Sequence, residues 1–126
     1  MRRAGDVLIV EDDPEIRKML ARLLASQGYA ARVAINRDTA LAALAERTPA
    51  LVLLDKAIPG DSAAVLERLR LIAPPVPAVL MTASYRASLE YDAGTFVASF
   101  VKPFDVSLLL DCIEQYVLPE GQERAV

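Results

Sequence analysis

The chain has 126 residues, no histidine, and a formal net charge of −3 with its basic residues scattered along the sequence. Its length and 54% hydrophobic content suit one packed domain. No apolar run approaches the roughly 20 residues that span a bilayer, and no signal-type core precedes the acidic EDD segment. We therefore expect a cytoplasmic protein without membrane insertion. The scattered charge argues against direct nucleic-acid binding, and the missing histidine excludes histidine-based metal sites, Ser-His-Asp triads and histidine acid/base chemistry.

The first predicted element is a short buried strand, DVLIV at residues 6–10, which stops abruptly at acids. A helix follows, because Asp13 and Pro14 supply an N-cap and a first-turn proline and Gly28 closes the segment. Its apolar residues recur at spacings of three and four: Ile16, Met19, Leu20, Leu23 and Leu24.

A weaker strand is predicted at residues 29–35, YAARVAI, and Asn36 is a candidate cap for a second helix that ends before Pro49. That helix would share one face among Ala40, Leu41, Leu44 and Ala45. The segment ALVLLD at residues 50–55 then repeats the opening pattern, since an apolar run again ends at an acid, Asp55. We predict a third strand there.

The turn KAIPGD leads into a third helix that stops at Pro74 and Pro75. Its repeating apolar residues are Val65, Leu66, Leu69 and Ile72. A fourth strand is predicted at residues 76–83, VPAVLMTA, followed by an ambiguous stretch at residues 84–95.

A fifth strand is predicted at residues 96–101, FVASFV, and a last helix capped by Asp105. That helix would turn inward Leu109, Leu110, Ile113 and Val117, with the single Cys112 on the same apolar face. We expect the domain to cover residues 1–118 and residues 119–126 to form a mobile polar tail.

Strands that alternate with helices require right-handed crossovers, which produce a parallel sheet covered on both faces. The predicted fold is therefore a doubly wound α/β domain. In such sheets the functional site forms beyond the carboxyl ends of the strands, near the point where the strand order reverses.

Four of the five predicted strands end in or just before polar residues, namely Glu11 and Asp12, then Asp55, Thr82 and Lys102. Three carboxylates brought together repel one another unless they share a cation, and oxygen ligands are those that Mg²⁺ prefers. The turn after the first strand is acidic rather than glycine-rich, so phosphate chemistry here would need a metal as intermediary. Lys102 and the Thr82 hydroxyl would supply a fixed cation and a neutral donor for a phosphoryl group carried on a carboxylate.

At these residues the chain resembles the response-regulator receiver family over nearly its whole length. The resemblance lies in LIVEDDPEIRKML, LVLLDKAIPGDSA, AVLMTAS and FVKPF, which occur in the family's order. It implies a five-stranded parallel sheet of flavodoxin-like order 2-1-3-4-5 with helices on both faces. It also implies a phosphoacceptor of a two-component phosphorelay, a signalling domain that catalyses only its own phosphotransfer and dephosphorylation.

The resemblance assigns Asp55 as the phosphoacceptor and as a ligand of Mg²⁺. Asp12 would be a direct metal ligand, Glu11 would act through water, and the backbone carbonyl of Ala57 would complete the protein's metal contacts. A histidine kinase or a phosphotransfer protein would donate the phosphoryl group, and we expect a monomer or weak dimer whose downstream protein partner is unknown.

By the same resemblance Thr82 would bond the phosphoryl group and report its presence, and Lys102 would pair with it. Pro103 would follow a cis peptide bond.

The chain departs from the family in the region that relays the signal. Receivers usually carry an aromatic residue three positions before the lysine, where this chain has Ser99, and alternation would turn Phe100 to the opposite side of the strand. We therefore predict that a signal uses another route than a relay from Thr82 to an aromatic ring. The interval from Thr82 to Lys102 is also short for the family, so the fourth helix is expected to be short, displaced or mobile.

Each site residue alone has an ordinary structural explanation, such as a turn acid for Asp55 or an N-cap for the EDD segment, and only their coincidence favours a phosphoacceptor. Two other functions remain open. A receiver-fold protein-interaction module could signal independently of phosphorylation, which Ser99 favours. A small phosphatase-type hydrolase shares the aspartyl-phosphate chemistry but normally needs a second acid near its nucleophile and a substrate cap.

Overall fold

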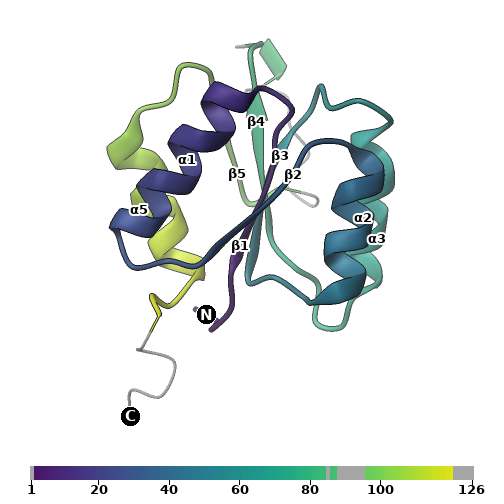
Figure 1. The fold of residues 1–126 in the computed structure, drawn as a ribbon, viewed down its shortest axis with the longest axis horizontal. Helices are drawn as coiled ribbons and strands as arrows, with labels where there is room; N and C mark the ends of the chain where they lie inside the picture. Colours follow the sequence, from purple (N-terminus) through teal and green to yellow (C-terminus); the bar gives the residue numbers. More distant parts are fainter. Residues whose placement is uncertain (1, 85, 88–95, 121–126) are drawn as a thin grey trace.

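The computed structural model describes residues 2–84, 86–87 and 96–120. Within these ranges strands and helices alternate along the chain from β1 to β4, and β5 and α5 follow (Figure 1). The elements are β1 Val7–Val10, α1 Pro14–Ser26, β2 Ala31–Ala34, α2 Arg37–Glu46, β3 Leu51–Asp55, α3 Ser62–Leu71, β4 Ala78–Thr82, β5 Ala98–Val101 and α5 Val106–Tyr116.

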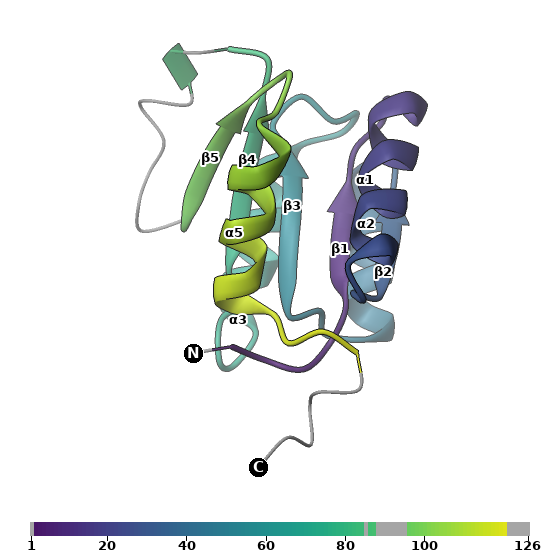
Figure 2. The ribbon, with the colours of Figure 1, turned by 90° about the vertical axis from the view of Figure 1, so that its left-hand side faces the viewer.

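The described strands form one five-stranded sheet in the order β2-β1-β3-β4-β5, and all neighbours are parallel. The predicted doubly wound architecture is thereby confirmed. Helices α1 and α5 cover one face of the sheet, and α2 and α3 cover the other (Figures 1 and 2). The strand order reverses between β1 and β3, which places the expected binding crevice beyond the carboxyl ends of these two strands.

Two hydrophobic cores lie on opposite faces of the sheet, and β1 contributes to both. Val7 and Ile9 pack in the core beneath α1 and α5, whereas Leu8 and Val10 pack in the core beneath α2 and α3. All four side chains are 0% exposed. Strands covered on both faces are continuous apolar runs rather than alternating patterns, which explains why DVLIV and ALVLLD stand out in the sequence.

Helix α5 packs its apolar face on the first of these cores. Leu109 and Ile113 are fully buried, and Cys112 lies beside them with 9% of its surface exposed. Burial raises the pKa of the Cys112 thiol above its ordinary value, so the thiol is held protonated in an apolar environment. The predicted inward face of the last helix is confirmed at these positions.

Each N-cap residue predicted from the sequence caps the first turn of its helix. The Asp13 carboxylate accepts the amide of Glu15 at 2.9 Å, and the Asp105 carboxylate accepts the amide of Leu108 at 3.2 Å. Asn36 accepts the amide of Thr39 at 2.8 Å and forms a capping box with it. These bonds satisfy amides that have no partner within the helix itself.

Several details differ from the sequence expectations. Strand β2 begins at Ala31 and β4 at Ala78, each two residues later than predicted. Met19, predicted within the apolar stripe of α1, is 39% exposed, because a helix lying on a sheet buries a stripe centred on Leu20 and Leu24 and leaves its flank in solvent. The fifth strand begins at Ala98 rather than at Phe96. Phe96 is nevertheless buried, in the core beneath α2 and α3.

The predicted irregular fourth helix, residues 84–95, falls mostly outside the described residues, as does the predicted tail at residues 119–126 beyond Glu120. Within the described ranges, no helix has both the length and the apolar character needed to cross a membrane.

A buried ion-pair network closes the amino-terminal end of β1. Asp6 is 4% exposed and pairs with Arg32 and with Arg47, whose Nη2 lies 2.8 Å from Asp6 Oδ2. Arg32 also donates to the carbonyls of Ala43 at 2.8 Å and Arg47 at 2.7 Å. The network therefore ties β1 and β2 to the end of α2.

Candidate functional site

The polar ends of β1, β3, β4 and β5 meet in an open pocket of about 710 Å³ at the carboxyl edge of the sheet. It contains every site residue predicted from the sequence. The lining residues are Glu11, Asp12, Asp13, Asp55, Lys56, Ala57, Thr82, Ala83, Ser84 and Lys102. Because the strands are parallel, residues that are distant in sequence end at the same edge.

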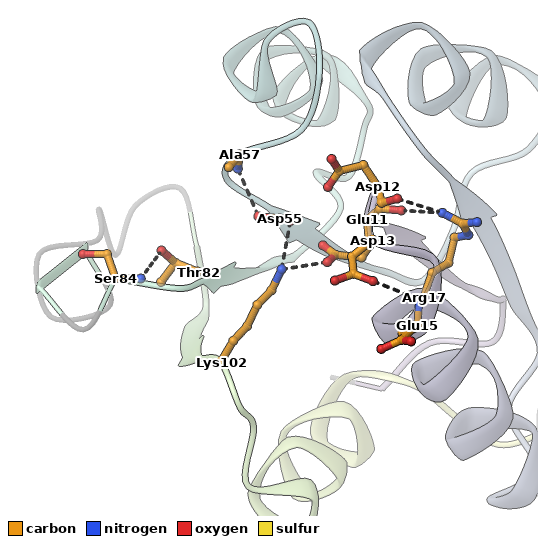
Figure 3. A network of polar contacts seen from close by, with 10 residues as sticks. All are labelled: Glu11, Asp12, Asp13, Glu15, Arg17, Asp55, Ala57, Thr82, Ser84 and Lys102. Carbon is orange, nitrogen blue, oxygen red and sulfur yellow. Dashed lines mark hydrogen bonds and ion pairs between the residues drawn. The ribbon is translucent and has the colours of Figure 1, made fainter.

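Lys102 joins the two buried acids of this pocket. Its Nζ donates to Glu11 Oε1 at 2.7 Å and to Asp55 Oδ2 at 2.9 Å (Figure 3). Burial alone would lower the pKa of the lysine, but the bonds to Glu11 and Asp55 outweigh burial and raise it. Lys102 is therefore an ammonium ion held between two carboxyl groups, and the peptide bond that follows it, to Pro103, is cis as predicted.

Asp55 is only 5% exposed, at the last position of β3. Its Oδ1 accepts the amide of Ala57 at 3.0 Å, while Oδ2 accepts from Lys102. Burial acts to raise the pKa of this carboxyl, but its interaction with the neighbouring Glu11 and its hydrogen bonds from Ala57 and Lys102 outweigh burial and lower it. Asp55 is therefore an ionised, oriented carboxylate at neutral pH.

The pKa of Glu11 shifts in the opposite direction from that of Asp55. The Glu11 side chain is fully buried. Burial, followed by the neighbouring carboxylate of Asp55, raises the pKa of Glu11 to about 8, and Lys102 offsets this only in part. Its Oε2 atom is buried without a hydrogen-bond partner among the described residues. A buried carboxyl oxygen left in this way indicates a site that can take a cation.

The acidic cluster at this edge of the sheet could hold a metal ion. Glu11, Asp12 and Asp55 each offer a carboxylate oxygen within 4.8 Å of the others. Hard oxygen ligands of this kind suit Mg²⁺, which neutralises neighbouring carboxylates and keeps several waters. The residues present therefore fit the predicted ion, and the Ala57 carbonyl stays a predicted ligand.

Thr82 ends β4 on the other side of Asp55 from the acidic pair (Figure 3). It is 5% exposed, and its Oγ1 accepts the amide of Ser84 at 3.1 Å rather than bonding Asp55 or Lys102. The backbone amide of Lys102 donates to the Thr82 carbonyl at 2.8 Å. The structure thus brings Thr82 to the pocket, at the end away from the acids.

Phe100 faces away from the side of the sheet on which Ser99 lies. Phe100 packs against the core beneath α1 and α5, whereas Ser99 is in register with Leu80, a residue of the opposite core. Position 99 therefore presents no aromatic ring on the face that it shares with Thr82.

Sequence reasoning missed one residue at this site, Arg17 of α1. Its Nη1 donates to the backbone carbonyls of Glu11 at 3.2 Å and Asp12 at 3.3 Å (Figure 3). A cation close to a helix amino terminus opposes the helix dipole. A basic residue near the start of a predicted helix was therefore the feature of the sequence that could have indicated this contact.

Comparisons with known proteins agree with this geometry. Residues 7–114 match the family model described as the response regulator receiver domain. The chain is 35% identical over 120 residues to the nitrogen assimilation regulatory protein NtrX of Azorhizobium caulinodans, covering 89% of this chain and 26% of that protein. It is 32% identical over 114 residues to sporulation initiation phosphotransferase F of Bacillus subtilis, covering 88% of this chain and 92% of that protein.

Solved structures show the same fold. NtrX from Brucella abortus superposes with a TM-score of 0.79 at 30% identity, over 90% of this chain and 26% of that one. TrrA from Thermotoga maritima, solved in complex with Mg²⁺-BeF, superposes with a TM-score of 0.77 at 27% identity, over 91% of this chain and 98% of that one. The chain thus spans about a quarter of the NtrX proteins and nearly the full length of phosphotransferase F and TrrA. The family match over residues 7–114, the shared sheet order and the acidic pocket lead to one conclusion: this chain belongs to the response-regulator receiver domain family.

Proposed function

We propose that this chain is the phosphoacceptor of a two-component phosphorelay, and that Asp55 takes the phosphoryl group from a histidine kinase or a phosphotransfer protein. The observation that carries the proposal is the state of Asp55. It is buried, ionised, and held by Lys102 and the Ala57 amide beside an acidic cluster. A fixed carboxylate anion at a pocket floor is suited to nucleophilic attack on phosphorus.

In the proposed step an Asp55 carboxylate oxygen attacks the phosphorus of a phosphohistidine. The new O–P bond forms as the P–N bond breaks, and the electron pair leaves with the imidazole nitrogen. The product is an acyl phosphate on Asp55. Little covalent chemistry is needed beyond this, so positioning and charge neutralisation dominate catalysis.

Glu11, Asp12, Asp55 and the Ala57 carbonyl would hold Mg²⁺. The ion would supply positive charge to phosphoryl oxygens that the acidic residues would otherwise repel. Lys102, already 2.9 Å from Asp55 Oδ2, would pair with the phosphoryl group as a fixed cation, and the Thr82 hydroxyl would serve as a neutral donor.

Acetyl phosphate with Mg²⁺ tests the acceptor directly, with modification followed by intact mass and by mapping the modified residue. We expect one phosphoryl group per wild-type chain and none in EDTA or in Asp55→Asn. Asp13→Asn is a matched control, because Asp13 is a nearby exposed acid whose N-cap bond asparagine can replace. Equal modification of Asp55→Asn and the wild type would refute the assignment, and turnover of small phosphate esters beyond one equivalent would favour the hydrolase.

We further propose that phosphorylation switches a partner interaction through the region between Thr82 and Lys102. A specific observation favours the alternative, an interaction module independent of phosphorylation: Ser99 offers no ring to reorient, and Phe100 packs on the opposite face. Amide NMR shifts on adding beryllofluoride and Mg²⁺ discriminate between the two. Shifts that reach residues 84–101 support the switch, whereas shifts confined to the pocket support the module.

A further inference from the structure

Arg17 reaches backward from α1 to the turn that carries the acidic pair. One terminal nitrogen, Nη1, donates to two successive carbonyls, those of Glu11 at 3.2 Å and Asp12 at 3.3 Å (Figure 3). The backbone amide of the same residue donates to the Asp13 carbonyl at 3.0 Å, which starts the helix. Arg17 thus links the rigid first turns of α1 to the backbone of both predicted metal ligands.

The Arg17 guanidinium is in an electrostatically unfavourable position. Close to a helix amino terminus, a positive charge meets the positive end of the helix dipole, where Glu15 is the favourable residue type. The two carbonyl contacts are the compensating interaction that the structure shows. The Nη1 atom of a guanidinium carries two N–H groups held in the plane of the group, so it can donate to two neighbouring acceptors at once.

The two acids differ in how much else restrains them. Glu11 is fully buried and bonded to Lys102. Asp12 is exposed, and its carboxylate makes no hydrogen bond or ion pair with any residue that the structure describes. The direction of the Asp12 side chain therefore depends on the backbone of the turn, which Arg17 holds.

We propose that Arg17 is a positioning residue for the magnesium site, fixing the Glu11–Asp12 turn so that both carboxylates point at one ion. The inference rests on the proposed function, because it assumes that these acids bind Mg²⁺. Groups that orient metal ligands without touching the metal typically contribute a factor of about 10–100 in affinity. Arg17 acts on the ligands through their backbone carbonyls.

Positioning and simple electrostatics predict opposite results for this residue. Removing a cation near an acidic site reduces repulsion of an incoming Mg²⁺, so charge alone would make Arg17→Ala bind the ion more tightly. Positioning predicts weaker binding. Lys18→Ala is the matched control, because the exposed neighbour on the same helix carries the same charge and contacts neither carbonyl.

The experiment is a titration of Mg²⁺ alone, followed by amide NMR, on the full chain of each variant. We expect Arg17→Ala to raise the Mg²⁺ dissociation constant about tenfold or more, Lys18→Ala to leave it unchanged or slightly lower, and Arg17→Lys to fall between wild type and Arg17→Ala. Phosphorylation of Arg17→Ala by acetyl phosphate should be slow at limiting Mg²⁺ and return to the wild-type rate at saturating Mg²⁺.

Stability measured by denaturant unfolding in EDTA separates positioning from a merely structural role. Mg²⁺ affinity in Arg17→Ala that matches Lys18→Ala, with or without lost stability, overturns the proposal. If Arg17→Ala does not fold, Arg17→Lys decides, because wild-type affinity in that variant also overturns it. A wild-type chain that binds no Mg²⁺ would instead refute the proposed function on which the inference rests.

Discussion

Lys102 and the metal would compete for the same carboxylate oxygens. The lysine lies 2.7 Å from Glu11 Oε1 and 2.9 Å from Asp55 Oδ2, and both acids are proposed ligands. Part of the lysine's pairing must therefore be given up when a divalent cation binds, since two cations cannot occupy one set of oxygens without repulsion.

Lys102→Ala should therefore have opposite effects on binding and chemistry. We expect a several-fold lower Mg²⁺ dissociation constant, because the competing cation is gone, and slower phosphorylation of Asp55, because the phosphoryl group loses its fixed cation. Amide NMR titration and acetyl phosphate labelling measure the two effects. Lys56→Ala removes the same charge from the same pocket without breaking either ion pair, so equal behaviour of the two variants would contradict this explanation.

Glu11 should make the metal-free protein less stable as pH rises. Its pKa is about 8 in the folded chain against an ordinary 4.5, so between these values the folded state binds more protons than the unfolded state. The free energy of unfolding then falls as pH rises through this window. The lowered pKa of Asp55 acts at more acidic pH, where the stability that it contributes is lost as pH falls.

Urea unfolding in EDTA at several pH values across 4.5 to about 8 measures this slope. Glu11→Gln should flatten it, because glutamine keeps the shape of the side chain and does not titrate. An equal slope in the variant would show that another group is responsible. Added Mg²⁺ should also reduce the slope for the wild type, by favouring the ionised carboxylate.

At the residue scale, the sequence was sufficient to predict which polar groups meet in one pocket, since Glu11, Asp12, Asp55 and Lys102 each stand at the end of an apolar run. The carbonyl contacts of Arg17 escaped prediction. They depend on the path of the turn and on a side chain that bends back along its helix, and periodicity encodes neither.

At the scale of elements, the turn between β3 and α3 packs tightly on the start of α2. Gly60 has φ +100°, and a Cβ atom added there would lie 2.6 Å from Arg37 Cβ. The Arg37 amide donates to the Pro59 carbonyl at 3.0 Å across the same contact. Glycine is required here both by its backbone conformation and by the close approach of the neighbouring chain.

Gly60→Ala should destabilise the fold by more than Gly28→Ala. Both glycines have positive φ, so both variants should lose roughly 1–3 kcal/mol from backbone strain, but an added Cβ at Gly28 meets only Pro119 at an ordinary 3.7 Å. The difference between their free energies of unfolding isolates the clash with Arg37. Equal losses in a denaturant titration would mean that the turn moves away at little cost.

Element boundaries were less predictable than element existence. Helix α1 carries a cap, a first-turn proline and a closing glycine, and the structure places it at Pro14–Ser26. The start of β5 was predicted two residues early, because Phe96 and Val97 are as apolar as the strand that they precede. Apolar character reports burial, whereas a strand begins where pairing with its neighbour begins.

At the scale of the whole molecule, β1 connects a buried ion-pair network to the candidate site. Asp6 precedes the strand and pairs with Arg32 and Arg47, and Glu11 follows it. The alternation of strands and helices was enough to predict a parallel sheet, but the position of β3 beside β1 followed from resemblance to a family. Hydrophobic period alone does not specify which edge a strand joins.

Asp6→Asn should therefore weaken the fold without altering the chemistry. Removing one member of a buried ion pair typically costs about 3–5 kcal/mol, and we expect the lower end because Arg32 keeps its carbonyl contacts. Asp38→Asn, which breaks an exposed pair with Arg37, should cost at most about 1 kcal/mol. Denaturant unfolding tests both values. Loss of acetyl phosphate labelling in folded Asp6→Asn would contradict the expectation that this network affects stability and not the chemistry.

The Cys112 thiol can report local opening of α5. It is the sole thiol of the sequence, and it is buried against the sheet with a raised pKa. A thiol reagent can react with it fully only when α5 separates from the sheet or when the whole domain unfolds. The labelling rate without denaturant therefore measures the population of open states at this helix. Comparing the rate with and without beryllofluoride would show whether the acyl-phosphate state tightens or loosens the contact of α5 with the sheet.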